Sequence, residues 1–171
     1  MEPEEGTVRR AQGGDPEAFG VLVREHEARL FRLARQALQS DEEAADAVQS
    51  AFLKAWQRLA LLRDPAAFPH WLTRILVNET RTVLRRRHPE WLSLDTLPEL
   101  PAPENLSDGE LRLWIRELPG PQRLALILRY VYGYGPDEIG AMLGTPSGTI
   151  RSRLHRAVRA LRRRLGAETG R

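Results

Sequence analysis

Hydrophobic and polar positions alternate along most of this chain with the period of an α-helix. Apolar residues recur every three or four positions over residues 15–38, 40–59, 65–87 and 136–165, and over shorter stretches between 107 and 131. This spacing places the apolar residues of each stretch on one helical face. No stretch shows the period of two that a half-buried strand requires. The pattern therefore predicts an all-α fold.

The predicted helices have recognisable starts. These signals are Asp15-Pro16, the capping box from Ser40 to Glu43, either Asp64-Pro65 or Phe68-Pro69, Pro121, and Gly135-Pro136. A capping oxygen satisfies the first backbone N–H groups of a helix, and proline fits its first turn. We expect residues 1–14, which precede the first of these signals, to be partly frayed.

The apolar stripes identify the residues that should form the core. In the N-terminal half these are Phe19, Leu22, Val23, His26, Leu30, Leu33, Ala34, Ala37, Ala45, Val48, Phe52, Ala55, Trp56, Leu59, Trp71, Leu72, Ile75, Leu76 and Val83. In the C-terminal half they are Leu124, Ala125, Ile127, Leu128, Val131, Ile150, Leu154, Val158, Leu161 and Leu165. We interpret His26 as a histidine at the edge of the core rather than as a ligand.

A proline-rich stretch without periodicity separates the two halves. It contains Pro89, Pro98, Pro101 and Pro103, and this composition is typical of a linker. The sequence thus predicts two small helical domains, residues 9–88 and 107–166, joined by a flexible linker over residues 89–106. About 18 residues reach roughly 60 Å when fully extended, which would let the two domains occupy two well-separated sites.

Composition narrows the class of protein. The chain has no cysteine, so it has neither disulfides nor thiolate metal sites. Its acidic start, MEPEEG, differs from the positive start of a signal peptide. No apolar run approaches the ~20 residues that span a bilayer. We therefore expect a cytoplasmic protein without membrane insertion.

The charges are unevenly placed, although the formal net charge is only +3. Acidic residues gather at Glu42, Glu43 and Asp46, whereas arginines gather over residues 81–87 and 151–164. Two basic clusters and one acidic patch suggest two contacts with nucleic acid and a separate, basic protein partner.

The most specific motif covers residues 136–164, which read as a short helix, a tight turn and a long basic helix. Gly144 should end the first helix, and Thr145 should cap the second. Small Gly140 and Gly144, with apolar Ile150, have the spacing of a helix-turn-helix, in which two helices approach closely.

Opposite its apolar stripe, the long helix carries polar and basic residues. These are Ser152, His155, Arg156, Arg159 and Arg163, flanked by Arg151 and Arg153. A helix packed on one side and basic on the other is what the major groove of DNA accepts. The alternative is an ordinary amphipathic helix with a solvated arginine face, and the turn signature favours DNA binding over it.

The segment DEIGAMLG followed by GTIRSRLHRAVRAL closely resembles the C-terminal promoter-binding domain of sigma factors, in particular those of the small, two-domain extracytoplasmic-function group. The resemblance extends over residues 9–88 and 107–165. It implies that the long helix reads the minus-35 promoter element through Arg151, Ser152, Arg153, His155 and Arg156.

The segment DAVQSAFLKAW resembles the sigma segment that docks on the clamp helices of the RNA polymerase core. The resemblance implies that Asp46 and Gln49 bind the core. The family usually has an acid after the Gln, whereas this chain has Ser50, so one carboxylate of the docking surface is missing. The alternative is a solvated polar helix face.

The segment FPHWLTRILVNETRTVLRRR resembles the sigma segment that reads and melts the minus-10 element. Its polar face carries Arg74, Asn78, Arg81 and Arg85. Asn78 falls where the family has an Asn that helps to hold an extruded base, and an amide can pair with a base edge through both of its groups. The alternative is that Asn78 only faces solvent.

The resemblance implies a transcription initiation factor that binds the RNA polymerase core and promoter DNA, and that has no catalytic residue, cofactor or metal of its own. Members of this group are often held by an anti-sigma partner. The main alternative is a helix-turn-helix activator or repressor with a different N-terminal regulatory domain. The lack of strand patterns and of a Gly-rich nucleotide loop disfavours that alternative. An enzyme is disfavoured because the chain lacks a Ser elbow, a P-loop and metal-spaced histidines.

Overall fold

The computed structural model describes residues 4–89 and 115–166, with side chains as far as Val158. Within these residues every regular element is a helix, which confirms the predicted all-α fold. The chain divides into an N-terminal unit, Met1–Val83, and a C-terminal unit, Leu84–Arg171. Apart from Pro89, the predicted linker lies outside the described residues, so the boundaries 9–88 and 107–166 remain predictions.

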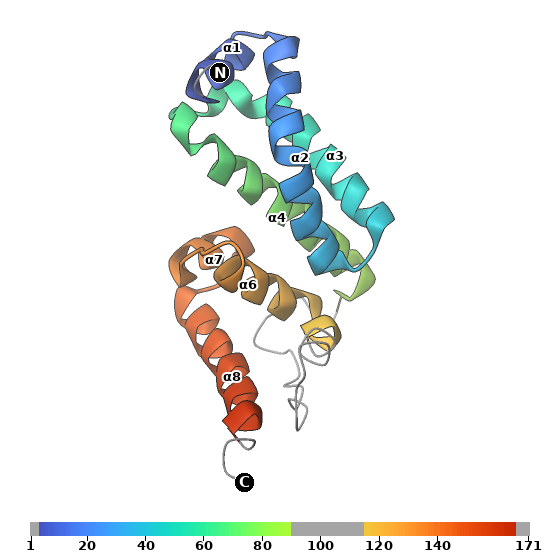
Figure 1. Ribbon diagram of the computed structural model, residues 1–171, viewed down its shortest axis with the longest axis vertical. Helices are drawn as coiled ribbons and strands as arrows, with labels where there is room; N and C mark the ends of the chain where they lie inside the picture. Colours follow the sequence, from blue (N-terminus) through green and yellow to red (C-terminus); the bar gives the residue numbers. More distant parts are fainter. Residues whose placement is uncertain (1–3, 90–114, 167–171) are drawn as a thin grey trace. The chain divides into compact units, whose positions relative to one another are not determined.

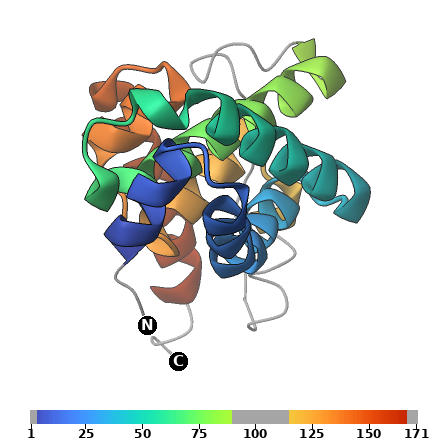
Figure 2. The same cartoon turned by 90° about the horizontal axis from the view of Figure 1, so that it is seen from above.

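Long helices make up most of the N-terminal unit (Figures 1 and 2). Its elements are α1 (Glu4–Gln12), α2 (Pro16–Leu38), α3 (Asp41–Arg58), the 3-10 turns η1 (Leu59–Leu61) and η2 (Pro65–Ala67), and α4 (Phe68–Arg87), whose last turn belongs to the C-terminal unit. Helix α2 packs against both α1 and α3.

The predicted helix starts in this unit are confirmed. The Asp15 carboxylate accepts hydrogen bonds from the first backbone N–H groups of α2, and the Ser40 hydroxyl accepts one from the Glu43 N–H at 3.3 Å. Both starts predicted for the third long helix are used, because Asp64 caps η2 and α4 begins at Phe68. The local signals therefore fix where each helix begins.

The core of the N-terminal unit follows most of the predicted stripes. Its large, fully buried side chains are Leu22, Leu30, Leu33, Leu38, Leu59, Phe68, Leu72 and Leu76. Predicted core residues that are only half-buried are Phe19, Val23, Trp71 and Val83. The prediction is wrong for Ala45 and Trp56, which are exposed. They lie beside a groove between α2 and α3 rather than in the core.

The expectation that residues 1–14 are partly frayed is wrong for residues 4–12, because α1 forms there and packs against α2; residues 1–3 lie outside the described part of the chain. The Gln12 side chain donates hydrogen bonds from Nε2 to the carbonyl oxygens of Leu59, at 3.1 Å, and Leu62, at 2.7 Å. These acceptors lie 47 and 50 residues further along the chain. Tertiary contacts therefore stabilise a helix that has only weak local signals.

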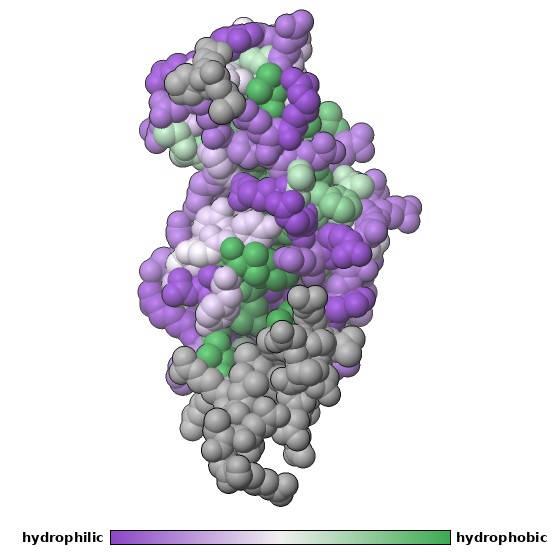
Figure 3. All heavy atoms as spheres, viewed as in Figure 1, coloured by the Kyte–Doolittle hydropathy of each residue, from purple (hydrophilic) through white to green (hydrophobic). Residues whose placement is uncertain are grey.

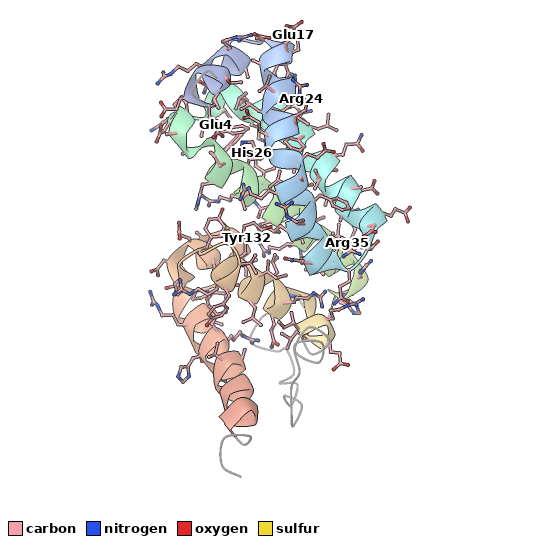
Figure 4. All side chains as sticks on the ribbon, viewed as in Figure 1. Glu4, Glu17, Arg24, His26, Arg35 and Tyr132 are labelled. Atoms are coloured by element: carbon pink, nitrogen blue, oxygen red, sulfur yellow. The ribbon has the colours of Figure 1, made fainter. Side chains whose placement is uncertain are left out.

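His26 lies at the edge of the core, as the sequence suggests (Figure 4). Its Nε2 atom is 2.9 Å from Oε1 of Glu4, which joins α2 to α1. Its ring centroid is 5.4 Å from that of Phe68 at the start of α4. Among the described residues no group of acidic and histidine side chains could hold a metal ion.

In the described part of the C-terminal unit, three helices that follow residue 119 pack together. These are α6 (Gly120–Tyr130), α7 (Pro136–Leu143) and α8 (Ser147–Gly166), and α6 contacts both of the others. Its buried apolar residues include Leu118, Leu124, Ala125, Ile127, Leu128, Ile139, Met142, Leu143, Ile150 and Leu154. The prediction that Val131 faces inward is wrong, since it follows the last turn of α6 and is 62% exposed.

A buried arginine fixes the chain that leads into α6. Nη1 of Arg123 donates to the carbonyl oxygens of Arg116, at 2.9 Å, and Leu118, at 2.7 Å. Burial lowers the pKa of Arg123 to about 10, and the nearby charge of Arg116 contributes in the same direction. Even so, the guanidinium stays charged at neutral pH and satisfies two carbonyl groups at the end of a helical turn.

None of the described helices is long and apolar enough to cross a membrane.

Candidate nucleic-acid interfaces and docking surface

The turn between α7 and α8 is very tight. Gly144 adopts the left-handed conformation, with φ of 60°, and ends α7 as predicted. A Cβ atom placed on Gly140 would lie only 2.6 Å from the carbonyl oxygen of Thr145. The predicted cap at Thr145 is wrong, because α8 begins at Ser147 and the Thr145 hydroxyl donates to the carbonyl oxygen of Leu143 at 3.3 Å.

The apolar stripe of α8 holds it against the rest of the C-terminal unit. Ile150 is 1% exposed and Leu154 is 6% exposed. They pack in the same core as Ile139 and Met142 of α7. One side of α8 is thereby fixed, and the opposite side is left for solvent or a partner.

The exposed side of α8 carries the α8 basic face, which consists of Arg151, Ser152, His155 and Arg156. All four side chains are exposed, as the sequence predicts. Arg153 departs from the prediction because it is buried, at 9% exposure. It lies between Ile150 and Leu154 in the sequence, on the flank of the apolar stripe, so its chain is drawn to the packed side.

Arg151 has an acidic neighbour that the sequence analysis did not identify. Its Nη2 atom donates to both carboxylate oxygens of Asp137 in the first turn of α7, at 2.9 Å each. The two residues lie 14 positions apart. The helix-turn-helix geometry brings them together, whereas helical periodicity alone does not.

Helix α4 carries the α4 polar face, which consists of Arg74, Asn78, Arg81 and Arg85. The steps of four, three and four residues place them on one side of the helix. The side chains of Arg74, Asn78 and Arg85 are exposed, and that of Arg81 is half-buried. The structure therefore presents this set as the sequence predicts.

The opposite side of α4 is anchored in the N-terminal unit. Leu72 and Leu76 are fully buried. Nη2 of Arg29 in α2 donates to the Thr73 hydroxyl at 2.8 Å and to the Pro69 carbonyl oxygen at 3.2 Å. These contacts fix the orientation of α4, so its polar face has a defined direction.

Trp71 lies at the edge of the core of this unit. It is half-buried, and its ring centroid lies 6.1 Å from that of Phe68. The core assignment made from the sequence therefore holds for only part of the side chain.

The predicted docking residues lie beside a groove of about 560 Å³ between α2 and α3. This α2–α3 groove is lined by Pro16, Phe19, Val23, Glu27, Phe31, Ala45, Val48, Gln49, Phe52, Leu53 and Trp56. Gln49 is part of the lining, and Asp46 is exposed on the same helix. Hydrophobic side chains reach the surface over α2 and α3 (Figure 3).

Aromatic contacts shape the α2–α3 groove, which the sequence analysis missed. The ring centroids of Phe19 and Trp56 are 4.9 Å apart, and those of Phe19 and Phe52 are 6.4 Å apart. Leu53 is 57% exposed. The signal that could have revealed the groove is the stripe of Phe19, Val23 and Phe31, which lies beside the buried stripe of α2.

An ion pair links α3 to α4. Nζ of Lys54 donates to the two carboxylate oxygens of Glu79, at 2.7 and 2.8 Å. The Glu79 side chain is only 15% exposed. The helix bearing Asp46 and Gln49 is thus attached directly to the helix bearing Asn78.

Family models match both halves of the chain. The model described as "Sigma-70 region 2" matches residues 22–89, and the model described as "Sigma-70, region 4" matches residues 108–161. The first match contains the α4 polar face and the predicted docking residues, and the second contains the α8 basic face.

Two solved structures have a similar fold. CnrH in complex with the cytosolic domain of CnrY has a TM-score of 0.64 and 27% identity, over 92% of this chain and 94% of that one. The sigma factor RpoE in complex with the anti-sigma factor NepR from Bartonella quintana has a TM-score of 0.63 and 26% identity, over 90% of this chain and 98% of that one.

Curated relatives match nearly the whole chain. The ECF RNA polymerase sigma-E factor of Escherichia coli (strain K12) is 36% identical in an alignment of 172 positions, gaps included, that covers 90% of each chain. The RNA polymerase sigma-H factor of Pseudomonas aeruginosa is 31% identical over 179 residues, covering 94% of this chain and 93% of the relative. Together with the helix-turn-helix and the two matched regions, these similarities show that the chain belongs to the sigma-70 family of RNA polymerase sigma factors, in its extracytoplasmic-function (ECF) group.

Proposed function

We propose that this sigma factor, as a promoter-specific transcription initiation factor, reads the minus-35 element with the α8 basic face. The observation that supports this assignment is the exposure of Arg151, Ser152, His155 and Arg156 on a helix whose other side is packed. An α-helix fits the major groove, where arginine pairs with guanine and serine or histidine can contact other base edges. The burial of Arg153 argues against a base contact for that residue.

The α4 polar face is proposed to capture the minus-10 element. Opening a base pair costs a few kcal/mol, so an extruded base must be held by specific contacts. Exposed Asn78 offers an amide for a base edge, and Arg74, Arg81 and Arg85 offer positive charge along the same side of the helix for the phosphates. The anchoring of α4 by Arg29 supports this role, because a capture surface must be held in place before the base arrives.

The α2–α3 groove and its polar edge are proposed to dock the clamp helices of the RNA polymerase core. An exposed apolar surface with a few polar groups is typical of a protein-binding site. Leu53 and Trp56 supply apolar contact area, Gln49 supplies an amide, and Asp46 supplies a negative charge at the edge. The Lys54–Glu79 ion pair would keep the docking helix in register with α4.

The remaining parts of the proposal concern organisation and partners. Domains over residues 9–88 and 107–166 would hold the two promoter elements, joined by the linker over residues 89–106. The protein would act in the cytoplasm without catalytic residues of its own. An anti-sigma partner is proposed as well, since RpoE of Bartonella quintana was solved with its anti-sigma factor NepR.

Reconstitution with RNA polymerase core tests the proposed function. DNA fragments retained by the holoenzyme are selected and sequenced, and the selected promoter is used for run-off transcription. The parent should initiate, and the double variant Arg151→Ala, Arg156→Ala should lose preference for the upstream element. If the double variant keeps both the affinity and the sequence preference of the parent, the α8 basic face does not read the minus-35 element.

A further inference from the structure

We propose that Asp137 is a positioning residue that orients Arg151 and makes base recognition by Arg151 selective for guanine. This inference rests on the proposed function of the α8 basic face. Nothing in the motif or in the family match assigns a role to Asp137. Its carboxylate accepts two hydrogen bonds from Nη2 of Arg151, each of 2.9 Å.

The position of the Asp137 carboxylate is set by a rigid part of the backbone. The start of α7 is capped by a hydrogen bond from the Gly135 N–H to Oε2 of Glu138, at 2.7 Å. Further along α7, the backbone approaches so closely at Gly140 that the turn into α8 has little freedom. The backbone of Asp137 is therefore held near the beginning of α8, where its carboxylate meets Arg151.

The hydrogen bonds between these residues leave a defined set of donors for DNA. A guanidinium has five N–H donors in one plane. The two oxygens of one carboxylate subtend too small an angle at Nη2 to take both of its N–H groups. The second N–H of Nη2 therefore remains, parallel to a neighbouring N–H of Nη1 or of Nε in the same plane. Guanine presents two acceptors, N7 and O6, in the major groove, and an arginine that is already oriented can bind both at once. Thymine, adenine and cytosine do not present this pair of acceptors.

The carboxylate also acts against binding that is not specific. A negative charge beside Arg151 offsets the attraction of that side chain for phosphates, which is the main source of sequence-independent affinity. Without Asp137, Arg151 would be free to contact phosphates in many orientations. Asp137 thus lowers the affinity for wrong sequences more than the affinity for the right one.

A purely structural role is not favoured by the exposure of the pair. The side chains of Arg151 and Asp137 are 56% and 74% exposed, and exposed ion pairs contribute little to stability. Asp137→Asn should therefore fold like the parent, which thermal unfolding followed by circular dichroism would confirm. The variant can then report on DNA recognition alone.

The test compares holoenzymes containing the parent, Asp137→Asn, Arg151→Ala and the double variant. Each is titrated with the selected promoter and with duplexes that carry one changed base pair in the upstream element. Glu117→Gln is the matched control, since it removes one exposed carboxylate from the same unit, on the chain before α6. Affinities are measured at several salt concentrations.

The expected result is a loss of discrimination at a single G·C pair. Asp137→Asn should reduce the preference for that pair by roughly fivefold or more, at the same position that Arg151→Ala affects. It should also make the slope of log affinity against log salt steeper by about 0.9, because one more cation can meet a phosphate. The double variant should discriminate no less than Arg151→Ala, and Glu117→Gln should behave like the parent.

Two results would overturn the inference, and they differ in what they say of the proposed function. If Arg151→Ala changes base preference but Asp137→Asn changes neither preference nor salt slope, Asp137 does not position Arg151, and the α8 basic face stands. If neither variant changes base preference, Arg151 does not read a base. That result contradicts both the positioning role of Asp137 and the proposed base contact of Arg151.

Discussion

The carbonyl oxygen of Thr145 lies only 2.6 Å from the place where a Cβ atom on Gly140 would be. Real Cβ atoms essentially never approach a backbone oxygen so closely. The α7–α8 turn can therefore be this tight only because residue 140 has no side chain. The approach also places Asp137 opposite Arg151. The placement of α8 against α7 therefore depends on the lack of a side chain at Gly140.

Gly140→Ala should destabilise the C-terminal unit. The methyl group would force the backbone of the α7–α8 turn apart, which costs roughly 1–3 kcal/mol of folding free energy. The higher helix propensity of alanine offsets about 1 kcal/mol of this cost. We expect a net loss of about 1 kcal/mol, measured as faster hydrogen exchange of the α7 and α8 amides. Gly148→Ala is the control, because a Cβ atom there meets nothing within 4 Å, and it should stabilise α8 by about 0.5–1 kcal/mol. Equal protection in the two variants would contradict the close approach.

The cap of α2 should make stability depend on pH in the acid range. The Ala18 N–H, followed by the Arg10 side chain, holds the pKa of Asp15 below its ordinary value of 3.8. Because the folded-state pKa is the lower one, the stabilisation is complete above about pH 4 to 5 and is lost as the pH falls through the folded pKa.

Asp15→Asn separates this effect from capping itself. Asparagine can still cap the helix but cannot titrate or pair with Arg10 as an ion. The melting temperature of the variant should be lower than that of the parent at neutral pH, and the difference should shrink as the pH falls below the ordinary pKa of 3.8 towards the lower folded-state pKa. A difference that stays constant down to pH 2 would show that the charge of Asp15 makes no contribution.

Several parts of the fold and the site were predictable from the sequence because their causes are local. Asp15, Ser40 and Gly144 act within one turn of their own helices, and the exposed α4 polar face follows from spacing alone. Helix α1 was missed because the acceptors of Gln12 lie 47 and 50 residues away. The burial of Arg153 was missed because a long side chain on the flank of a stripe can turn to either side.

The α2–α3 groove was missed for a different reason. Ala45 and Trp56 continue the apolar stripe of α3, and a pattern cannot tell a core position from an exposed apolar surface. Only the packing of α2 on α3 shows that these residues line an open groove together with Phe19. Apolar residues at a docking surface therefore look like core residues in the sequence.

Asp46→Lys should weaken binding to the polymerase core and leave DNA binding by the C-terminal unit unchanged. A reversed charge at the edge of the interface brings like charges together if the partner is basic, and we expect at least a roughly tenfold loss, or about 1.4 kcal/mol. Glu25→Lys is the matched control, because it reverses an exposed charge on the neighbouring helix α2. A pull-down titration in which both variants match the parent would argue against this surface.

Leu53→Asp tests the apolar part of the same docking surface. Leu53 is 57% exposed, so its replacement should leave folding intact, as checked by circular dichroism. Burying a carboxylate in the interface should weaken core binding by roughly tenfold or more. Unchanged core affinity of a folded Leu53→Asp protein would exclude the α2–α3 groove from the contact.

The central claim is that one chain both places the polymerase on duplex DNA and captures the melted strand, and Asn78→Ala tests it most directly. Asn78 is exposed, so the variant should fold, bind the core and recognise the minus-35 element as the parent does. Permanganate footprinting of the minus-10 element on a duplex promoter should show open-complex formation reduced by roughly fivefold or more. A premelted template should restore most of the activity. If the variant opens duplex promoters as well as the parent, Asn78 does not capture a base and the proposed role of the α4 polar face is contradicted at its centre.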